Sequence, residues 1–168
     1  MSAETLSTPR LRLRRPLAAD DARLTHLIND PDVARMTTRI PHPYRLQDAH
    51  DFLAHASDSL FAIDLSEAGL IGLIGFRDAT VLGPEIGHWI GKPYWGRGLA
   101  TGAATAAVVW AHRDWSKRCL VSGHFADTPA SGEVLNKAWF LYTGEVTKHS
   151  SLARGGQVVH TRRMIRLA

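Results

Sequence analysis

The stretch YWGRGLATGAATAAVVWAH, residues 94–112, changes within a few positions from a glycine-containing loop to a sequence typical of a helix. Gly96 and Gly98 flank Arg97, and an apolar run rich in alanine follows from about Leu99. The first N–H groups of a helix have no acceptor within the helix, and the helix dipole is positive there. Glycine allows a ligand to approach such a backbone closely. The stretch therefore predicts a phosphate or pyrophosphate site at a helix start, with a simple tight turn as the alternative.

Two familiar phosphate-binding motifs do not fit this loop. A Walker A loop requires G-x-x-x-x-G-K-[ST], but Pro93 follows Gly91-Lys92 here. A dinucleotide fingerprint requires a third glycine, and that position is Thr101. The loop is therefore assigned to neither class.

Strand-like and helix-like segments alternate on both sides of this stretch. Residues 10–17 alternate leucine with arginine, which predicts a strand with one apolar face. Leu24, Leu27 and Ile28 have helical spacing, as do the apolar residues between 46 and 56. Further strands are predicted at 60–65, 70–77, 83–91, 118–125, 142–149 and 157–167, a further helix over 128–140, and irregular structure over 30–45.

The order of these segments predicts a mixed sheet. Three successive strands between 60 and 91 are expected to form an antiparallel meander, and the strand–helix–strand unit after them to be parallel. We expect an α+β fold in one domain, residues 1–168, with about seven strands and helices on both faces of the sheet. The helix between the parallel strands would turn toward the core its apolar stripe, Leu99, Ala103, Ala106, Ala107 and Trp110.

The composition is typical of a soluble protein that binds an anion. The chain has 168 residues, a net charge of +4 and a sequence pI near 9.6. Its arginines and lysines are scattered, which argues against nucleic-acid binding. Cys119 is the single cysteine, and the nine histidines lack metal-ligand spacing, so neither a disulfide nor a metal site is expected. The sequence shows no secretory signal and no apolar run of membrane-spanning length, so we expect a cytoplasmic protein without membrane contact.

Three segments give the chain a family resemblance that covers nearly its whole length. EIGHWIGKPYWGRGLAT (85–101) resembles the central signature of the GCN5-related N-acetyltransferase (GNAT) superfamily, RimJ/RimL type. Residues 6–35 resemble the opening strand and first helix of that group, and DTPASGEVLNKAWF (127–140) resembles a later segment less closely. The resemblance implies the mixed sheet already expected, with a splayed cleft for acetyl-CoA as co-substrate and no metal. Homodimers are common in the resembling group.

The resemblance also implies which residues contact acetyl-CoA. The end of strand 83–91 would run beside the pantetheine arm, and the glycine loop would hold the pyrophosphate through backbone N–H groups. The acyl thioester would lie in the opening between this strand and strand 118–125. Thr128 occupies a position where the family usually has an asparagine that contacts CoA. The implied cofactor-binding residues are Trp89, Ile90, Gly91, Trp95, Gly96, Arg97, Gly98, Leu99, Ala100, Thr101 and Thr128.

The implied reaction is direct attack of a primary amine on the thioester carbonyl. A protonated amine cannot attack, so a base is needed, directly or through water. Glu85 and His88 are candidates, and they point to opposite faces because they lie three apart on one strand. Their alternative roles are a paired or solvent-exposed glutamate and a packing or substrate-wall histidine. Ser131 matches a family serine that could donate to the leaving thiolate, or it is a helix-surface serine, and N–H groups near Ile90 could stabilise the oxyanion.

The acceptor is the least determined part of the hypothesis. A protein N-terminus or a small-molecule amine would suit the reaction, and Ile28, Tyr44 and Trp89 would line its site because the first helices usually cover it in this fold. Trp139 stands where the family usually has glycine, and its ring would need space near the cofactor or in the core. This change and Thr128 favour an alternative function, a non-catalytic acyl-CoA-binding module of the same fold.

Overall fold

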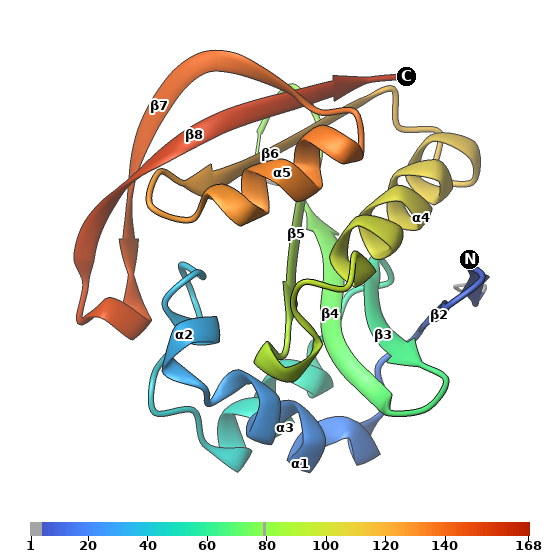
Figure 1. The fold of residues 1–168 in the computed structure, drawn as a ribbon, viewed down its shortest axis with the longest axis vertical. Coiled ribbons are helices and arrows are strands. Elements are labelled where there is room, and N and C mark those ends of the chain that lie inside the picture. Colours follow the sequence, from blue (N-terminus) through green and yellow to red (C-terminus); the bar gives the residue numbers. More distant parts are fainter. Residues whose placement is uncertain (1–4, 79) are drawn as a thin grey trace.

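The computed structural model describes residues 5–78 and 80–168, and within them eight strands form one sheet (Figure 1). Their spatial order is β1-β2-β3-β4-β5-β6-β8-β7, and every neighbouring pair is antiparallel except β5–β6. The meander and the parallel strand–helix–strand unit are confirmed. The strands are β1 Leu6–Ser7, β2 Leu11–Arg14, β3 Leu60–Leu65, β4 Gly69–Arg77, β5 Glu85–Ile90, β6 Cys119–Phe125, β7 Leu141–Ser151 and β8 Gln157–Leu167.

One strand and one helix in this architecture were not predicted. The strand β1 has two residues, too few to show a period of two, and it pairs with β2 at the edge of the sheet. The helix α2 begins where the Asp30 side chain accepts the N–H of Asp32 and Pro31 occupies the first turn. The helices are α1 Asp21–Ile28, α2 Pro31–Ala34, α3 Leu46–Ala54, α4 Leu99–Arg113 and α5 Pro129–Lys137, with 3₁₀ turns η1 Ala18–Asp20, η2 Lys92–Tyr94 and η3 Leu152–Arg154.

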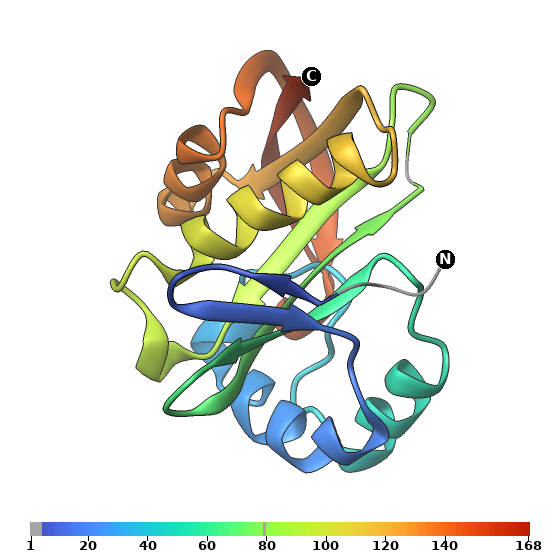
Figure 2. The ribbon, with the colours of Figure 1, turned by 90° about the vertical axis from the view of Figure 1, so that its right-hand side faces the viewer.

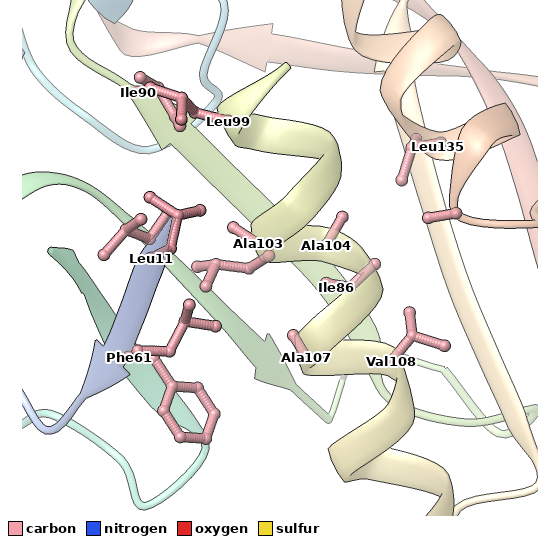
Figure 3. Close-up of a cluster of buried hydrophobic side chains, with 14 of the residues drawn as sticks. Leu11, Phe61, Ile86, Ile90, Leu99, Ala103, Ala104, Ala107, Val108 and Leu135 are labelled. Carbon is pink, nitrogen blue, oxygen red and sulfur yellow. The ribbon is translucent and has the colours of Figure 1, made fainter. Parts of the chain in front are cut away.

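Helices cover both faces of the sheet, as predicted (Figure 2). The helices α4 and α5 pack on one face, and their contacts there include Leu11, Phe61 and Ile86. Figure 3 shows Ala103 and Ala107 of α4 directed toward Leu11 and Phe61. We call this side the α4/α5 face.

The buried stripe of α4 is wider than predicted. Leu99, Ala103 and Ala107 are buried as expected, but Ala104 and Val108 are buried as well. The reason is α5, which packs along that side of α4 and presents Leu135 to it (Figure 3). Ala106 and Trp110 are only partly buried.

The first helices pack on the opposite face of the sheet, which we call the α1/α3 face. Leu24, Leu27 and Ile28 of α1 are buried there together with Trp89 of β5. Helix α3 lies outside this layer and buries only Ala49. Its predicted apolar positions Leu46 and Phe52 are therefore largely exposed.

Candidate functional site

The strands β5 and β6 separate soon after they meet. Glu85 and Val121 are their only register pair. The last contact is the Ser122 hydroxyl, which donates to the Ile86 carbonyl at 3.0 Å. Beyond this point the two strands diverge (Figure 1), so the predicted splaying of these strands is confirmed. We call the space between residues 87–90 and 123–125 the opening.

The two faces of the opening carry different side chains. Counting on from the Glu85–Val121 pair places Gly87 opposite Gly123, and His88 opposite His124. Because side chains alternate along a strand, the histidines lie on the same face as Ile86, the α4/α5 face. The glycines lie on the α1/α3 face. The α4/α5 face of the opening thus carries two imidazole rings. On the α1/α3 face, Gly87 and Gly123 contribute no side chain.

Backbone groups of β5 also face the opening. The carbonyls of Pro84 and Ile86 accept bonds from β6, so the even-numbered residues of this strand direct their backbone toward β6. The N–H groups of His88 and Ile90 therefore point into the opening, where β6 no longer pairs with them. The Ile90 carbonyl accepts the Trp95 indole N–H at 2.6 Å, which joins the strand to the following turn. Either donor alone suits an oxyanion, but at about 3.3 Å per residue the two nitrogens are too far apart to share one oxygen.

The glycine turn has the conformation that a phosphate site requires. Gly96 and Gly98 both have positive φ, +71° and +72°. A Cβ at either residue would meet no atom within 4 Å, so backbone conformation and not space demands glycine there. Helix α4 begins directly after Gly98, at the residue predicted from the sequence. Leu99 itself is buried in the core, so it offers the turn only its N–H group.

The Arg97 side chain is engaged in a surface ion pair. Its guanidinium donates to Glu67 Oε1 at 3.0 Å, and both side chains are largely exposed. Its backbone carbonyl accepts the Arg10 guanidinium at 2.9 Å. A phosphate contact by Arg97 would require it to leave Glu67, and exposed pairs of this kind are worth only about 0–1 kcal/mol.

Glu85 is held between two arginines. Arg77 Nη2 donates to Oε2 at 2.6 Å, and Arg163 Nη1 donates to Oε1 at 2.8 Å. Burial acts to raise the pKa of Glu85, but the two guanidiniums outweigh it, so its pKa lies below the usual range. The residue also lies at the closed end of the opening. Both oxygens are occupied and the carboxylate is stabilised, which argues against the predicted role as general base.

His88 has the opposite character. Its half-buried ring has no hydrogen-bond or charged partner among the described residues. Desolvation lowers its pKa to about 4. The imidazole is therefore neutral at pH 7, with one nitrogen free to accept a proton or a hydrogen bond.

Ser131 and Thr128 lie at the start of α5. The Ser131 hydroxyl is half-buried and has no partner within the described part of the chain. Thr128 is buried, and its hydroxyl donates to the Phe125 carbonyl at 3.0 Å. The one proton of that hydroxyl is thus used within its own turn, and only its lone pairs remain for a ligand.

His124 and Tyr142 form a pair that the sequence did not reveal. His124 Nδ1 lies 2.8 Å from the Phe125 carbonyl and must donate to it, so in the neutral ring Nε2 accepts from the Tyr142 hydroxyl at 2.9 Å. A Cβ on Gly132 of α5 would lie 2.6 Å from both atoms of this bond. The glycine lets α5 rest on the pair. The alternation of side chains along β6 could have placed His124 on the inner face of the sheet. Its partner Tyr142 could not be found in this way, because the contact depends on how β7 pairs within the sheet.

The Trp139 ring does not lie in the core. It is 72% exposed, so space near the cofactor stays the predicted alternative. Its backbone has φ +70°, just after the end of α5, a left-handed conformation that favours glycine.

Ile28 and Tyr44 are core residues. Ile28 is fully buried, and Tyr44 is 7% exposed beside Trp89. Burial, followed by the nearby Asp48 carboxylate, raises the pKa of Tyr44 to about 12. Because Ile28 has no exposed surface, its predicted acceptor contact is corrected, whereas that of Tyr44 stays a prediction.

A groove of about 490 Å³ leads to the closed end of the opening. Its floor includes Glu85, Val121 and Arg163. Its rim includes Arg39, from the loop between α2 and α3, and Glu145 of β7. Neither rim residue's charged group has a partner among the described residues. We call this hollow the acceptor-side groove.

A second hollow, of about 640 Å³, lies between the β1–β2 hairpin and α4 and includes Gly98. Within residues 5–78 and 80–168, no three or more His, Cys, Asp or Glu side chains are placed to hold a metal ion. None of the helices in this part of the chain is long and apolar enough to cross a membrane.

Comparison with known proteins identifies one family whose model matches most of the chain. Residues 10–140 match the family model described as "Acetyltransferase (GNAT) domain". A search of curated proteins finds no match.

Solved structures with this fold include several acetyltransferases. A GNAT-family acetyltransferase from Bacillus anthracis matches with a TM-score of 0.85 and 19% identity over 98% of both chains. RimL, the ribosomal L7/L12 α-N-protein acetyltransferase solved with coenzyme A, matches with 0.82 and 16% over 98% of both chains. Spermidine N-acetyltransferase from Vibrio cholerae, solved with CoA and spermine, matches with 0.78 and 17% over 95% of this chain and 96% of that one. At these identities the likeness concerns the fold.

Proposed function

Since the chain belongs to the acetyltransferase (GNAT) family and is an acetyl-CoA-dependent N-acetyltransferase, we propose a route for the transfer. The acetyl group passes directly to a primary amine that enters through the acceptor-side groove. The observation that carries the proposal is the opening, where β5 and β6 share one register pair beside a helix start with two left-handed glycines. A thioester can lie between the strands only because they part. The groove supports an approach from the α1/α3 face, where Gly87 and Gly123 leave the backbone bare.

The coenzyme would be held by backbone along one continuous path. The N–H groups from Gly96 to Thr101 suit the pyrophosphate, whereas the Trp95 N–H already donates to the Lys92 carbonyl. The strand end at Trp89–Gly91 suits the pantetheine arm. Arg97 would exchange its surface partner Glu67 for phosphate. Thr128 would contribute as an acceptor, since its proton is donated to Phe125.

The chemistry would be shared by a few groups around the opening. The amine nitrogen forms a bond to the thioester carbonyl carbon, and the carbon–sulfur bond breaks. The N–H group of Ile90 would donate to the oxyanion. The neutral His88 ring would accept a hydrogen bond from the attacking amine, but its pKa of about 4 makes it a weak base, so the proton that the amine loses would pass to water. The Ser131 hydroxyl would donate to the thiolate. The proton lost by the amine balances the proton that the thiolate gains.

The non-catalytic alternative has lost its main support. It was motivated chiefly by Trp139, whose ring is exposed and does not displace the core. Its other motive, Thr128, retains lone pairs for a ligand. Catalysis is therefore the function that we carry forward.

Release of free thiol from acetyl-CoA tests the proposal. Purified protein should release thiol when an amine is added, with no acetyl-enzyme detected by mass spectrometry. Ser131→Ala should lower kcat by roughly 10-fold, less than the ~100-fold or more expected for a general base, and leave the KM for acetyl-CoA unchanged. Ser57→Ala, in the exposed loop between α3 and β3 and outside both hollows, is the control and should behave like the parent protein. Coenzyme A binding without thiol release for any amine would refute direct transfer.

A further inference from the structure

We propose that the acceptor is a free α-amino acid, and that Arg77 and Arg163 bind its carboxylate at the floor of the acceptor-side groove. This inference rests on the proposed transfer to an amine. It narrows the acceptor to compounds in which amine and carboxylate share one carbon.

The floor of the groove carries an excess positive charge. Arg77 and Arg163 share a single carboxylate, Glu85, which gives each guanidinium one oxygen. A guanidinium has five N–H donors, so each arginine keeps donors that Glu85 does not use. The side chains of Glu85 and Arg163 are each only 12% exposed. Arg77 is more open, with its side chain 41% exposed, so its unused donors can be reached by an anion. A carboxylate matches the planar fork of a guanidinium.

The second argument is position, because the positive floor lies at the opening itself. A Cβ on Gly123 would meet Arg163 Nη1 at 2.9 Å, so the guanidinium crosses β6 over this glycine to reach Glu85 on β5. Gly123 borders the opening on the α1/α3 face. A carboxylate bound by Arg163 would therefore lie within a few ångströms of the point where an amine must enter. Two groups so close together on one acceptor describe an α-amino acid.

The charges of the groove disfavour the other acceptor classes. A polyamine would meet two guanidiniums that share one carboxylate at the floor, and like charges repel in a sheltered site. The lining as a whole holds three arginines and three carboxylates, because Arg39, Asp78 and Glu145 join the floor residues, so it offers a polyamine no excess of negative charge. A protein N-terminus has a neutral amide where the free amino acid has its carboxylate. It would leave the spare guanidinium donors without a charged partner.

Matched acceptors test this inference. Initial rates of thiol release from saturating acetyl-CoA would be compared for amino acids and for their α-carboxamides with the same side chain, corrected for the fraction of neutral amine. We expect kcat/KM to be higher for the free acids by about tenfold or more, the worth of one charge-assisted hydrogen-bond pair. Spermidine and a short peptide complete the panel and should be poorer acceptors than the free acids.

A substitution identifies the group responsible. Arg77→Gln leaves Glu85 and Arg163 as a balanced pair, and it should reduce the acid-to-amide ratio about tenfold with no change in the KM for acetyl-CoA. Arg12→Gln is the control, because Arg12 also pairs with a carboxylate, Asp64, but lies on β2 outside the groove. The control should keep the parent ratio.

The outcomes separate this inference from the proposed function. Thiol release that is equal or faster with amides, peptide or spermidine would overturn the amino-acid acceptor and leave N-acetyl transfer intact. An unchanged ratio in Arg77→Gln would remove the floor arginines from recognition. No thiol release with any acceptor would refute the transfer and the acceptor together. If Arg77→Gln fails to fold, the ratio measured on the parent protein decides.

Discussion

His88 and Glu85 lie on one strand, and their surroundings give them opposite protonation behaviour. Glu85 is fixed as a carboxylate by two arginines, whereas His88 has lost solvent without gaining a partner. An imidazole with a pKa of about 4 carries no charge from roughly pH 5 upward. Charge on His88 therefore does not limit the reaction near neutral pH. The limiting group should be the ammonium of the acceptor.

The pH dependence of kcat/KM should consequently follow the acceptor. We expect log kcat/KM to rise with unit slope at low pH and to level off near the ammonium pKa of whichever acceptor is used. That is about 7.7–8.0 for an α-amino group of a peptide and about 10.4 for a lysine-type amine. Profiles recorded with one acceptor of each kind provide the measurement and its internal control. An inflection fixed near pH 6.5 for both acceptors would show that a histidine of ordinary pKa controls the rate.

The sequence identified Glu85 and His88 as candidate bases but did not show which of them could take that role. It placed them on opposite faces of one strand, and the structure agrees. It could not show that Arg163, 78 positions away, reaches Glu85. That contact depends on β6 pairing with β8 and on Gly123 leaving space, which are properties of the folded sheet.

At the scale of elements, the end of α5 shows a conflict between sequence and conformation. Trp139 has φ +70°, which costs a residue with a Cβ about 1–2 kcal/mol relative to glycine. Its ring is 72% exposed and returns little packing energy. We expect Trp139→Gly to raise the free energy of unfolding by about 0.5–1 kcal/mol, because the greater freedom of glycine in the unfolded chain cancels part of the gain.

Urea denaturation measures this change, and Trp139→Ala is its control. Alanine removes the ring but keeps the Cβ, so it should not stabilise the protein. An equal gain for alanine and glycine would place the effect in the loss of the ring and not in the backbone.

Elements with strong local signals were predicted well, and those fixed by their neighbours were not. The start of α4 at Leu99 and the turn at Gly155-Gly156 follow from glycine and periodicity. The burial of Ala104 and Val108 depends on α5, which no pattern within α4 reveals. The same applies to the exposed Phe52 of α3, since only the packing of helices decides which apolar residues are covered.

At the scale of the whole molecule, the sheet consists of two parts joined weakly at the opening. The strands β1 to β5 form one part and β6 to β8 the other, with one register pair between them. Other contacts also hold the parts together. The ion pair of Glu85 with Arg163 runs from β5 to β8 across β6, and α4 packs on both β5 and α5. The Ser151 hydroxyl at the end of β7 donates to the Thr37 carbonyl. A ligand between the strands would add a connection at the opening itself.

Coenzyme A should therefore stabilise both parts at once. At 100 times its Kd, any ligand of the native state alone adds about 2.7 kcal/mol to the free energy of unfolding. Our specific expectation concerns which amides coenzyme A protects from exchange. Amide hydrogen exchange should slow in residues 88–90 of β5 and 123–125 of β6, as well as at the start of α4. A nucleotide without the pantetheine arm, 3′-phosphoadenosine diphosphate, is the control and should protect the α4 start while leaving β6 unchanged. If both ligands protected the same amides, the pantetheine arm would not lie between the strands, and the opening would lose its assigned role.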